Sequence, residues 1–289
     1  MSFNKKIKKD GNWDIEIRPV SGWKGISLKE ILEFKGLIYL LVKRDLVVFY
    51  KQTILGPLWY IIQPVFNSLV FTFIFGTIAS IPTDGAPPFL FYLAGSVIWG
   101  YFAHAFTLSS QVFVTNAAVF GKVYYPRITV PISISISSVV QFLVQFVIFL
   151  GFFFYYKSNG FESDISFLTP LIILICIIQI AILSIGFGMV VSAITARYRD
   201  LVMALTFTVQ LWMYLTPVVY PLSEVPEEYK TFILLNPMTV PVELFKSSFF
   251  GVYSLSSEAY LISWGITFIV FILGSIIFNR IDKTFMDTV

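Results

Sequence analysis

Six long stretches of the chain contain no Asp, Glu, Lys or Arg. They cover residues 52–83, 85–121, 128–156, 165–196, 201–223 and 259–279. About 20 apolar residues in a helix cross the hydrocarbon layer of a bilayer, so each stretch is long enough to span it. The pattern therefore predicts an all-α membrane protein with six transmembrane helices. Their expected positions are about 54–79, 89–113, 129–156, 167–195, 201–220 and 258–279.

The charged residues between these stretches are distributed unevenly. Eleven of the 20 Lys and Arg residues lie in residues 1–52, and six more follow the second, fourth and sixth predicted spans. Lys157, Lys230 and Lys246 remain for the other side of the membrane. Because cytoplasmic loops carry the excess of Lys and Arg, both termini are predicted to be cytoplasmic.

An interfacial helix is predicted over residues 28–50, after a polar extension, residues 1–27, with no predicted regular structure. Ser27 and Glu30 have the spacing of a capping box, in which each side chain satisfies a free backbone N–H. Apolar residues then recur at steps of three and four, namely Ile31, Phe34, Ile38 and Leu41. An amphipathic helix of this kind lies along a membrane surface; the alternative is a basic lead-in to the first span. The six-span domain is expected to cover residues 51–285.

Proline divides the segment between the fifth and sixth spans into short pieces. The prolines are Pro217, Pro221, Pro226, Pro237 and Pro241. Irregular backbone at membrane depth must be buried in protein or line a wet cavity. We therefore expect two short re-entrant outer helices, about 226–235 and 240–250, that dip into the outer leaflet. The alternative is an ordinary external loop, which would expose apolar side chains such as Phe232 and Leu244 to water.

The predicted spans lack the groups that catalysis, metal binding or ion coupling needs. Cys176 is the single cysteine and cannot form a disulfide within the chain. His104 has no acidic or cysteine companion in its span, which favours a helix-packing or pore-lining role over a metal or catalytic one. No phosphate-binding loop is present, and the net charge of +3 does not indicate nucleic acid binding. A passive channel, a structural membrane protein or the membrane half of a two-subunit machine remain.

Aromatic residues make up 18% of the chain, and many lie within the predicted spans. The C–H faces of sugar rings stack on aromatic planes, so some of these residues are candidates for a carbohydrate path. The candidates are Tyr60, Trp99, Tyr101, Trp212 and Tyr214. For each of them the alternative is packing in protein, in lipid or at the membrane interface.

Several local motifs follow one another in a fixed order. Residues 49–59 read Phe-Tyr-Lys-Gln-Thr-Ile-Leu-Gly-Pro-Leu-Trp, with Leu55, Gly56 and Trp59 at the entry to the first span. The inner loop 121–127, Arg-Tyr-Arg-Asp-Leu at 197–201, Thr-Pro-Val-Val-Tyr-Pro at 216–221 and Asn-Pro-Met at 236–238 follow. Over about residues 28–285 this combination resembles the permease subunit of ABC-2-type polysaccharide exporters, the family that exports O-antigen, teichoic acid and capsule.

The resemblance implies a multi-pass protein of the bacterial inner or plasma membrane that is not an enzyme by itself. It implies a homodimer with two copies of a separate ATPase chain, which binds ATP and Mg; no cofactor or metal is implied in this chain. Lipid-linked polysaccharide would pass along the dimer seam, among membrane lipids. The alternatives are a drug or lipid efflux permease of related type, and a passive channel or scaffold.

The resemblance also implies where coupling and gating take place. The helix at 28–50 would lie against the ATPase, and the loop 115–127 would transmit its motion. The candidate coupling residues are Phe120, Gly121, Lys122, Val123, Tyr124, Tyr125 and Arg127. The short segments after the fifth span would form the outer gate, with candidates Pro217, Tyr220, Pro221, Asn236 and Pro237.

Overall fold

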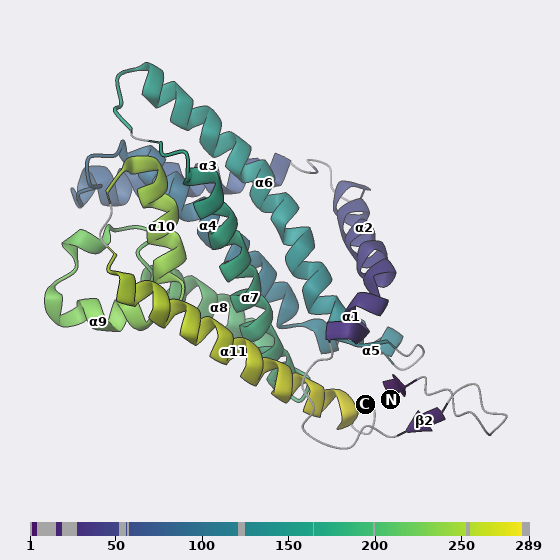
Figure 1. The fold of residues 1–289 in the computed structure, drawn as a ribbon. Coiled ribbons are helices and arrows are strands. Elements are labelled where there is room, and N and C mark those ends of the chain that lie inside the picture. The colour runs from purple at the N-terminus through teal and green to yellow at the C-terminus, as the bar shows by residue number, and fades with distance from the viewer. Residues whose placement is uncertain are drawn as a thin grey trace.

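The chain folds into a bundle of long helices (Figure 1). The computed structural model describes residues 2–4, 16–18, 28–51, 56, 58–120, 125–163, 165–198, 200–252 and 255–284. The fold and its sites are described for these residues.

Five helices are long and apolar enough to cross a membrane. They are α3 (Leu58–Phe71, continued by the π-helix η1, Thr72–Ile78), α4 (Pro88–Ser109), α6 (Thr129–Ser158), α7 (Thr169–Thr195) and α11 (Ser257–Thr284). A shorter apolar helix, α8 (Leu201–Tyr214), lies between the last two. The predicted all-α membrane fold with about six spans is confirmed.

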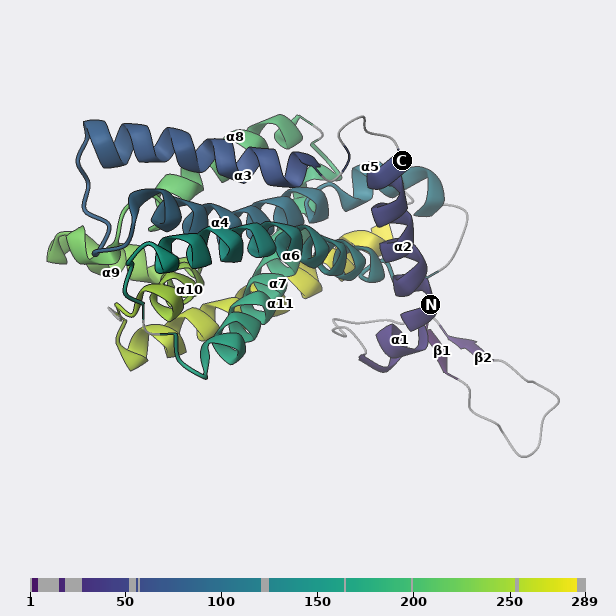
Figure 2. The same cartoon turned by 90° about the horizontal axis from the view of Figure 1, so that it is seen from above.

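The shorter elements gather at the two ends of the bundle. At one end lie α1 (Leu28–Glu33), α2 (Lys35–Lys51) and α5 (Val112–Phe120). At the other lie η2 (Leu222–Glu224), α9 (Glu227–Leu235) and α10 (Thr239–Phe250). Figures 1 and 2 both separate α1, α2 and α5 from α9 and α10. In the N-terminal extension, β1 (Ser2–Asn4) pairs antiparallel with β2 (Glu16–Arg18), which was not predicted.

Several helix boundaries differ from the prediction, and α11 continues past the predicted end at residue 279 to Thr284. A turn at Phe34 divides the predicted helix 28–50 into α1 and α2. The second span ends at Ser109, where the Ser110 hydroxyl donates to the Phe106 carbonyl at 2.7 Å and α5 starts separately. The fifth span was expected to reach residue 220 but ends at Tyr214. Proline at 217 explains this end, because its ring disfavours helical backbone just before it.

Helix α4 is the central helix of the bundle. It contacts α3, α6, α7, α8 and α10, and Figure 2 shows it between α3 and α6. In its most apolar stretch 72% of the residues are buried, compared with 11% for α3. Tyr92, Tyr101 and Phe102 of α4 are among the largest fully buried side chains. The faces of the bundle that point outward therefore belong mainly to the helices around α4.

Glycine allows α7 to approach its neighbours closely. A Cβ atom added at Gly186 would lie 3.0 Å from the backbone of Phe271 in α11. A Cβ at Gly188 would collide with the side chain of Ser109 at the end of α4. Small residues let helix backbones come together in a membrane, where dispersion contacts replace the hydrophobic effect as the driving force.

Candidate functional site

The end of the bundle that carries α1, α2 and α5 is held by one hydrophobic cluster. We call it the basic end, because the Lys and Arg residues of α2 lie there. Its buried members are Val112, Phe113, Phe120, Tyr125, Ile128, Val130, Ile134, Ile185, Met189 and Phe278. They come from α5, the following loop, α6, α7 and α11, so a displacement of α5 is resisted by three long helices.

The apolar face of α1 and α2 packs against this cluster. Ile31, Phe34 and Leu41 of the predicted stripe do so, together with Leu37 in place of Ile38. The turn at Phe34 shifts the helical phase, since the Leu37 N–H bonds to the Phe34 carbonyl, three residues back. Of the predicted capping box, Ser27 lies outside the described residues, and the side chain of Glu30 is not described either.

Arg127 fastens the loop after α5 to the end of α11. Its Nη1 lies 2.7 Å from Asp282 Oδ1 and donates to the Asp282 carbonyl at 3.1 Å. Its guanidinium carbon lies 4.9 Å from the centroid of the Phe120 ring, within range of a cation–π interaction. The Arg127 side chain is only 12% exposed, so solvent screens this charge pair weakly.

Tyr125 completes this joint. Its ring packs edge to face against Phe120, with centroids 5.9 Å apart. Burial raises the pKa of its phenol above the ordinary value, and the positive charges of Arg44 and Arg127 partly lower it again. The phenol therefore stays protonated at neutral pH.

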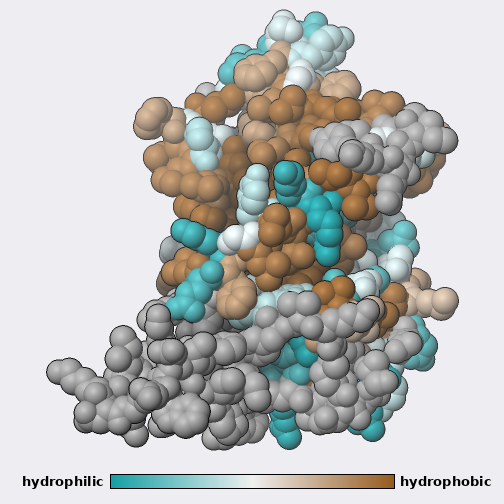
Figure 3. All heavy atoms as spheres, turned by 90° about the vertical axis from the view of Figure 1, so that its right-hand side faces the viewer, coloured by the Kyte–Doolittle hydropathy of each residue, from teal (hydrophilic) through white to brown (hydrophobic). Residues whose placement is uncertain are grey.

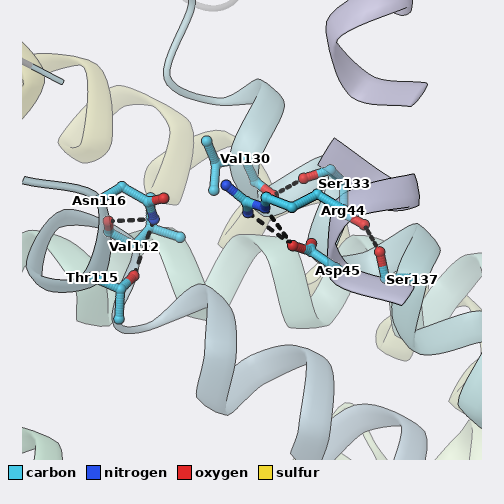
Figure 4. Close-up of polar contacts among 8 residues, drawn as sticks. All are labelled: Arg44, Asp45, Val112, Thr115, Asn116, Val130, Ser133 and Ser137. Atoms are coloured by element: carbon cyan, nitrogen blue, oxygen red, sulfur yellow. Dashed lines mark hydrogen bonds and ion pairs between the residues drawn. The ribbon is translucent and has the colours of Figure 1, made fainter. Parts of the chain in front are cut away.

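The surface of the basic end mixes charged and apolar side chains. Arg44 of α2 binds the neighbouring Asp45 through two hydrogen bonds of 2.9 and 2.8 Å to Oδ1. Figure 4 shows this pair beside Ser133 and Ser137 of α6. Figure 3 shows the right-hand side of Figure 1, where hydrophilic residues lie between larger hydrophobic areas of the described surface.

The predicted coupling residues therefore divide into two groups. Phe120 and Tyr125 are buried and Arg127 is largely buried, so within the subunit they hold the loop in place. Gly121, Lys122, Val123 and Tyr124 lie outside the described residues.

The entry motif of the first span depends on its glycine. Gly56 has a φ of 48°, a left-handed conformation that strains residues with a side chain. Its carbonyl accepts the Trp59 N–H at 3.3 Å, so the turn leads directly into α3. Trp59 is exposed, and Leu55 lies outside the described residues.

The aromatic residues proposed for a carbohydrate path do not share one surface. Trp99 is buried, and the Trp212 ring lies 6.3 Å away in the same packed aromatic group. Tyr101 is fully buried, with its hydroxyl 3.3 Å from Ser135 Oγ. Tyr60 is half-buried and Tyr214 is exposed. Packing in the core therefore accounts for Trp99 and Tyr101 in this chain.

The Tyr60 ring stands edge to face with the His104 ring, at a centroid distance of 6.3 Å. The His104 Nδ1 atom lies 3.0 Å from Ser138 Oγ on α6. This contact between α4 and α6 agrees with the helix-packing interpretation of His104. Among the described residues, no group of three or more His, Cys, Asp and Glu lies close enough to hold a metal ion.

We call the opposite end, with the 79–87 turn, residues 215–226, α9 and α10, the loop end. Asn236 joins its parts. Its Oδ1 accepts hydrogen bonds from Trp212 Nε1 and from the Met238 N–H, each at 3.1 Å. Its Nδ2 donates to Thr216 Oγ1 at 2.8 Å and to the Leu215 carbonyl at 3.3 Å. One side chain thus connects the end of α8 to the turn between α9 and α10.

The other predicted gate residues lie around this junction. Pro217, Pro221 and Pro237 are buried, and Tyr220 is half-buried. The Pro237 carbonyl accepts the Ser263 hydroxyl of α11 at 3.0 Å. The structure thus buries three of the five predicted gate residues, while Tyr220 and Asn236 are half-buried at the same end.

Comparison with known proteins identifies the family. Residues 36–250 match the family described as "ABC-2 type transporter". The chain belongs to the ABC-2 type transporter family. The resemblance drawn from the motifs is therefore confirmed at the level of the family.

Three curated relatives match nearly the whole ABC-2 chain. Two O-antigen export system permease proteins RfbA of Klebsiella pneumoniae are 29% and 27% identical over 252 and 251 residues, each covering 87% of this chain and 94% of the relative. An O-antigen export system permease protein RfbA of Myxococcus xanthus is 23% identical over 264 residues, or 91% of this chain and 98% of the relative.

Tyr220 of this ABC-2 chain also lines a shallow hollow of about 550 Å³ at the loop end. The hollow lies between the end of the first span and the start of α9. Its lining comprises Ala79, Ser80, Ile81, Pro82, Tyr220, Glu224, Val225, Pro226, Tyr229 and Ile233.

Sequence reasoning missed a buried ion pair in α10. Lys246 Nζ lies 3.0 Å from Glu243 Oε1, and the residues are 3% and 5% exposed. The sequence placed Lys246 on the outer side of the membrane and assigned it no partner. The spacing of three residues between opposite charges in an apolar helix is the signal that was available.

Proposed function

We propose that the chain is the membrane-spanning permease subunit of an ATP-driven exporter of lipid-linked polysaccharide, of O-antigen or teichoic acid type. The observation that carries this proposal is the family assignment together with the near-complete coverage of relatives that are O-antigen export permeases. The chain would lie in the bacterial inner or plasma membrane, with both termini and residues 1–27 in the cytoplasm. Its six-span permease domain would cover residues 51–285.

ATP hydrolysis would occur on a separate ATPase chain that binds ATP and Mg. We place its docking surface at the basic end. Leu32, Tyr39 and Leu40 of α1 and α2 are exposed apolar side chains there, beside the exposed Lys43 and Arg44. Exposed apolar residues among charged ones are typical of a protein–protein interface.

Motion would pass from the ATPase to the spans through the loop 115–127. The Arg127–Asp282 pair and the cluster around Phe120 support this, because they connect the loop to α6, α7 and α11. A push on Lys122 or Tyr124 would then move long helices as well as the loop itself.

The polysaccharide would pass along the seam between two copies of the chain. The low burial of α3 supports this position, since an apolar helix with 11% of its most apolar stretch buried leaves most of its surface for lipid or for a second copy. Of the candidate path residues, Tyr60 and Tyr214 do not belong to the hydrophobic core cluster that includes Trp99, Tyr101 and Trp212. The loop end would form the outer gate, with Asn236 at its hinge.

Deletion of the gene with complementation tests the whole proposal. Loss of the permease should leave lipid-linked glycan on the cytoplasmic side and none at the cell surface, and the wild-type chain should restore export. An unchanged amount of surface glycan would contradict it. Export of a drug or lipid in place of glycan would favour the efflux alternative, and solute flux through the purified chain without an ATPase would favour a passive channel.

Two substitutions test the coupling loop. Lys122→Glu and Tyr124→Ala should abolish glycan export while the partner ATPase still hydrolyses ATP and the permease still inserts. Lys157→Glu is the matched control, because Lys157 is exposed at the opposite end of α6. Export at the wild-type rate in both loop variants would remove the coupling assignment.

A further inference from the structure

Glu243 and Lys246 form an ion pair that is nearly closed off from solvent. Their side chains are 7% and 3% exposed, and the Oε1–Nζ distance is 3.0 Å. Transfer of two charges from water into such a place is costly, and their attraction recovers this cost only with good geometry and further hydrogen bonds. An ion pair kept here therefore needs a reason other than stability.

The pair on α10 lies between α4 and η2. Lys246 Nζ lies 4.0 Å from the centroid of the Phe91 ring, in a cation–π contact with the buried first turn of α4. Burial raises the pKa of the Glu243 carboxyl, while Lys246 and, to a smaller extent, the backbone N–H of Leu222 in η2 lower it. Lys246 thus contacts α4, while Glu243 faces η2. Together they fix how α10 is oriented toward both elements.

The outer turn before α4 extends this connection. The Ser223 hydroxyl of η2 donates to Asp84 Oδ1 at 2.7 Å. The negative charge of Asp84 also acts on Lys246 and on Glu243, attracting the first and repelling the second. Burial and the negative charge of Glu243 both raise the pKa of Tyr220, which lies just before η2. Among the described residues, the titratable groups that interact with the pair, Asp84 and Tyr220, belong to the loop end.

Apolar contacts alone would hold α10 less specifically. Phe245 and Phe249 pack among the phenylalanines of α6, such as Phe149 at 5.7 and 4.9 Å between centroids. Such ring contacts tolerate a sliding or rotated helix, whereas a carboxylate and an ammonium tolerate little displacement. Buried polar pairs are known to fix the register of helices at a cost in stability.

We propose that Glu243 and Lys246 are positioning residues of the outer gate, which hold α10 and η2 against α4 in the closed arrangement. The inference rests on the proposed function for the gate and deepens it. Without the pair, α10 can still pack through its phenylalanines, but η2 and the loop from Pro221 to Val225 lose their fixed place. The outer end then opens without ATP hydrolysis.

The experiment measures leak and stability separately. The chain with Glu243→Met and Lys246→Met is reconstituted in liposomes loaded with radiolabelled maltose, without ATPase or ATP, and its apparent melting temperature is measured in detergent. Apolar replacement of both partners of a buried pair is commonly neutral or stabilising, so the melting temperature should equal or exceed that of the wild type. The leak should rise at least about tenfold, as expected when a closed state loses part of its preference over an open one.

Two further variants complete the design. Lys246→Arg keeps the charge and the cation–π contact, so it should seal like the wild type. The matched control is Glu227→Met with Lys230→Met on α9, which removes an exposed pair of the same spacing with an N···O distance of 2.8 Å. This control should leave the leak unchanged, because surface pairs contribute little.

Wild-type leak in the folded double Met variant would overturn the proposal. If that variant does not fold, Ser223→Ala decides, since this exposed substitution removes the Asp84 contact without threatening the core. It should raise the leak above that of the exposed-pair control, and an equal leak would overturn the proposal. The assay needs no glycan and no ATPase, so a failure of the export function itself remains distinguishable.

Discussion

Replacing Asn236 with alanine removes four hydrogen bonds at once from the junction of α8 with α9 and α10. Two of them are accepted by Oδ1, from Trp212 Nε1 and the Met238 N–H, and two are donated by Nδ2, to Thr216 Oγ1 and the Leu215 carbonyl. Met238 and Thr216 are buried, so water does not readily replace the lost partner.

The expected cost follows from the groups that stay behind. A buried donor without an acceptor costs about 1–3 kcal/mol, and Asn236→Ala leaves the Met238 N–H and the half-buried Trp212 N–H in this state. The acceptors that remain, Thr216 Oγ1 and the Leu215 carbonyl, add less. We therefore expect a loss of about 2–4 kcal/mol, which lowers the melting temperature of a domain of this size by roughly 5–10 °C.

The assay is thermal unfolding of the purified chain in detergent, followed by tryptophan fluorescence. Asn159→Ala is the matched control, because Asn159 is exposed at the end of α6 and donates one side-chain bond, to the Tyr155 carbonyl at 2.8 Å. Asn236→Asp keeps the acceptor for Trp212 and Met238 and should fall between the two. Equal melting temperatures of Asn236→Ala and Asn159→Ala would show that the four Asn236 hydrogen bonds do not hold this junction together.

Two further predictions concern close packing and the basic end. Gly95→Ala places a Cβ 2.7 Å from the Val218 carbonyl oxygen, and we expect about 1–3 kcal/mol of destabilisation from overpacking. Gly151→Ala on α6 meets nothing within 4 Å and should stabilise the helix by about 0.5–1 kcal/mol; equal melting temperatures of these two variants would contradict the packing. Arg127→Gln breaks the pair with Asp282, and should reduce ATP-driven export with little loss of inserted protein. Asp282→Asn should have the same effect, and the double variant should add nothing to it; additive losses would show that the two residues act separately.

Much of the architecture follows from the sequence because long helices in a bilayer have a strong signal. Charge-free stretches of the right length predicted the all-α fold, and α9 and α10 match the short helices expected between the prolines. Proline at 217 also indicated that the fifth span ends near Tyr214. The prediction extended the span to residue 220 because the residues beyond Tyr214 are still apolar. Local motifs were enough for the family, because they occur in order over most of the chain.

The candidate site was harder to predict. Trp99 and Tyr101 looked like equally good path residues, yet both are buried among helices. Hydrophobicity does not separate core from surface in a membrane, because lipid tails are as apolar as the protein interior. Sequence alone therefore does not decide which aromatic face packs and which stays open.

The sequence by itself determined that the chain is an all-α membrane protein with about six apolar helices, the approximate place of these helices, and the family. These features can be predicted because span length, the placement of charged residues and local motifs are properties of contiguous stretches of the chain. Only the tertiary structure decided that Arg127 binds Asp282, that Asn236 joins α8 to α10, and that Glu243 and Lys246 are enclosed against Phe91. These contacts depend on how helices far apart in sequence approach one another, and the cost of burying a charge is settled only by the groups that surround it.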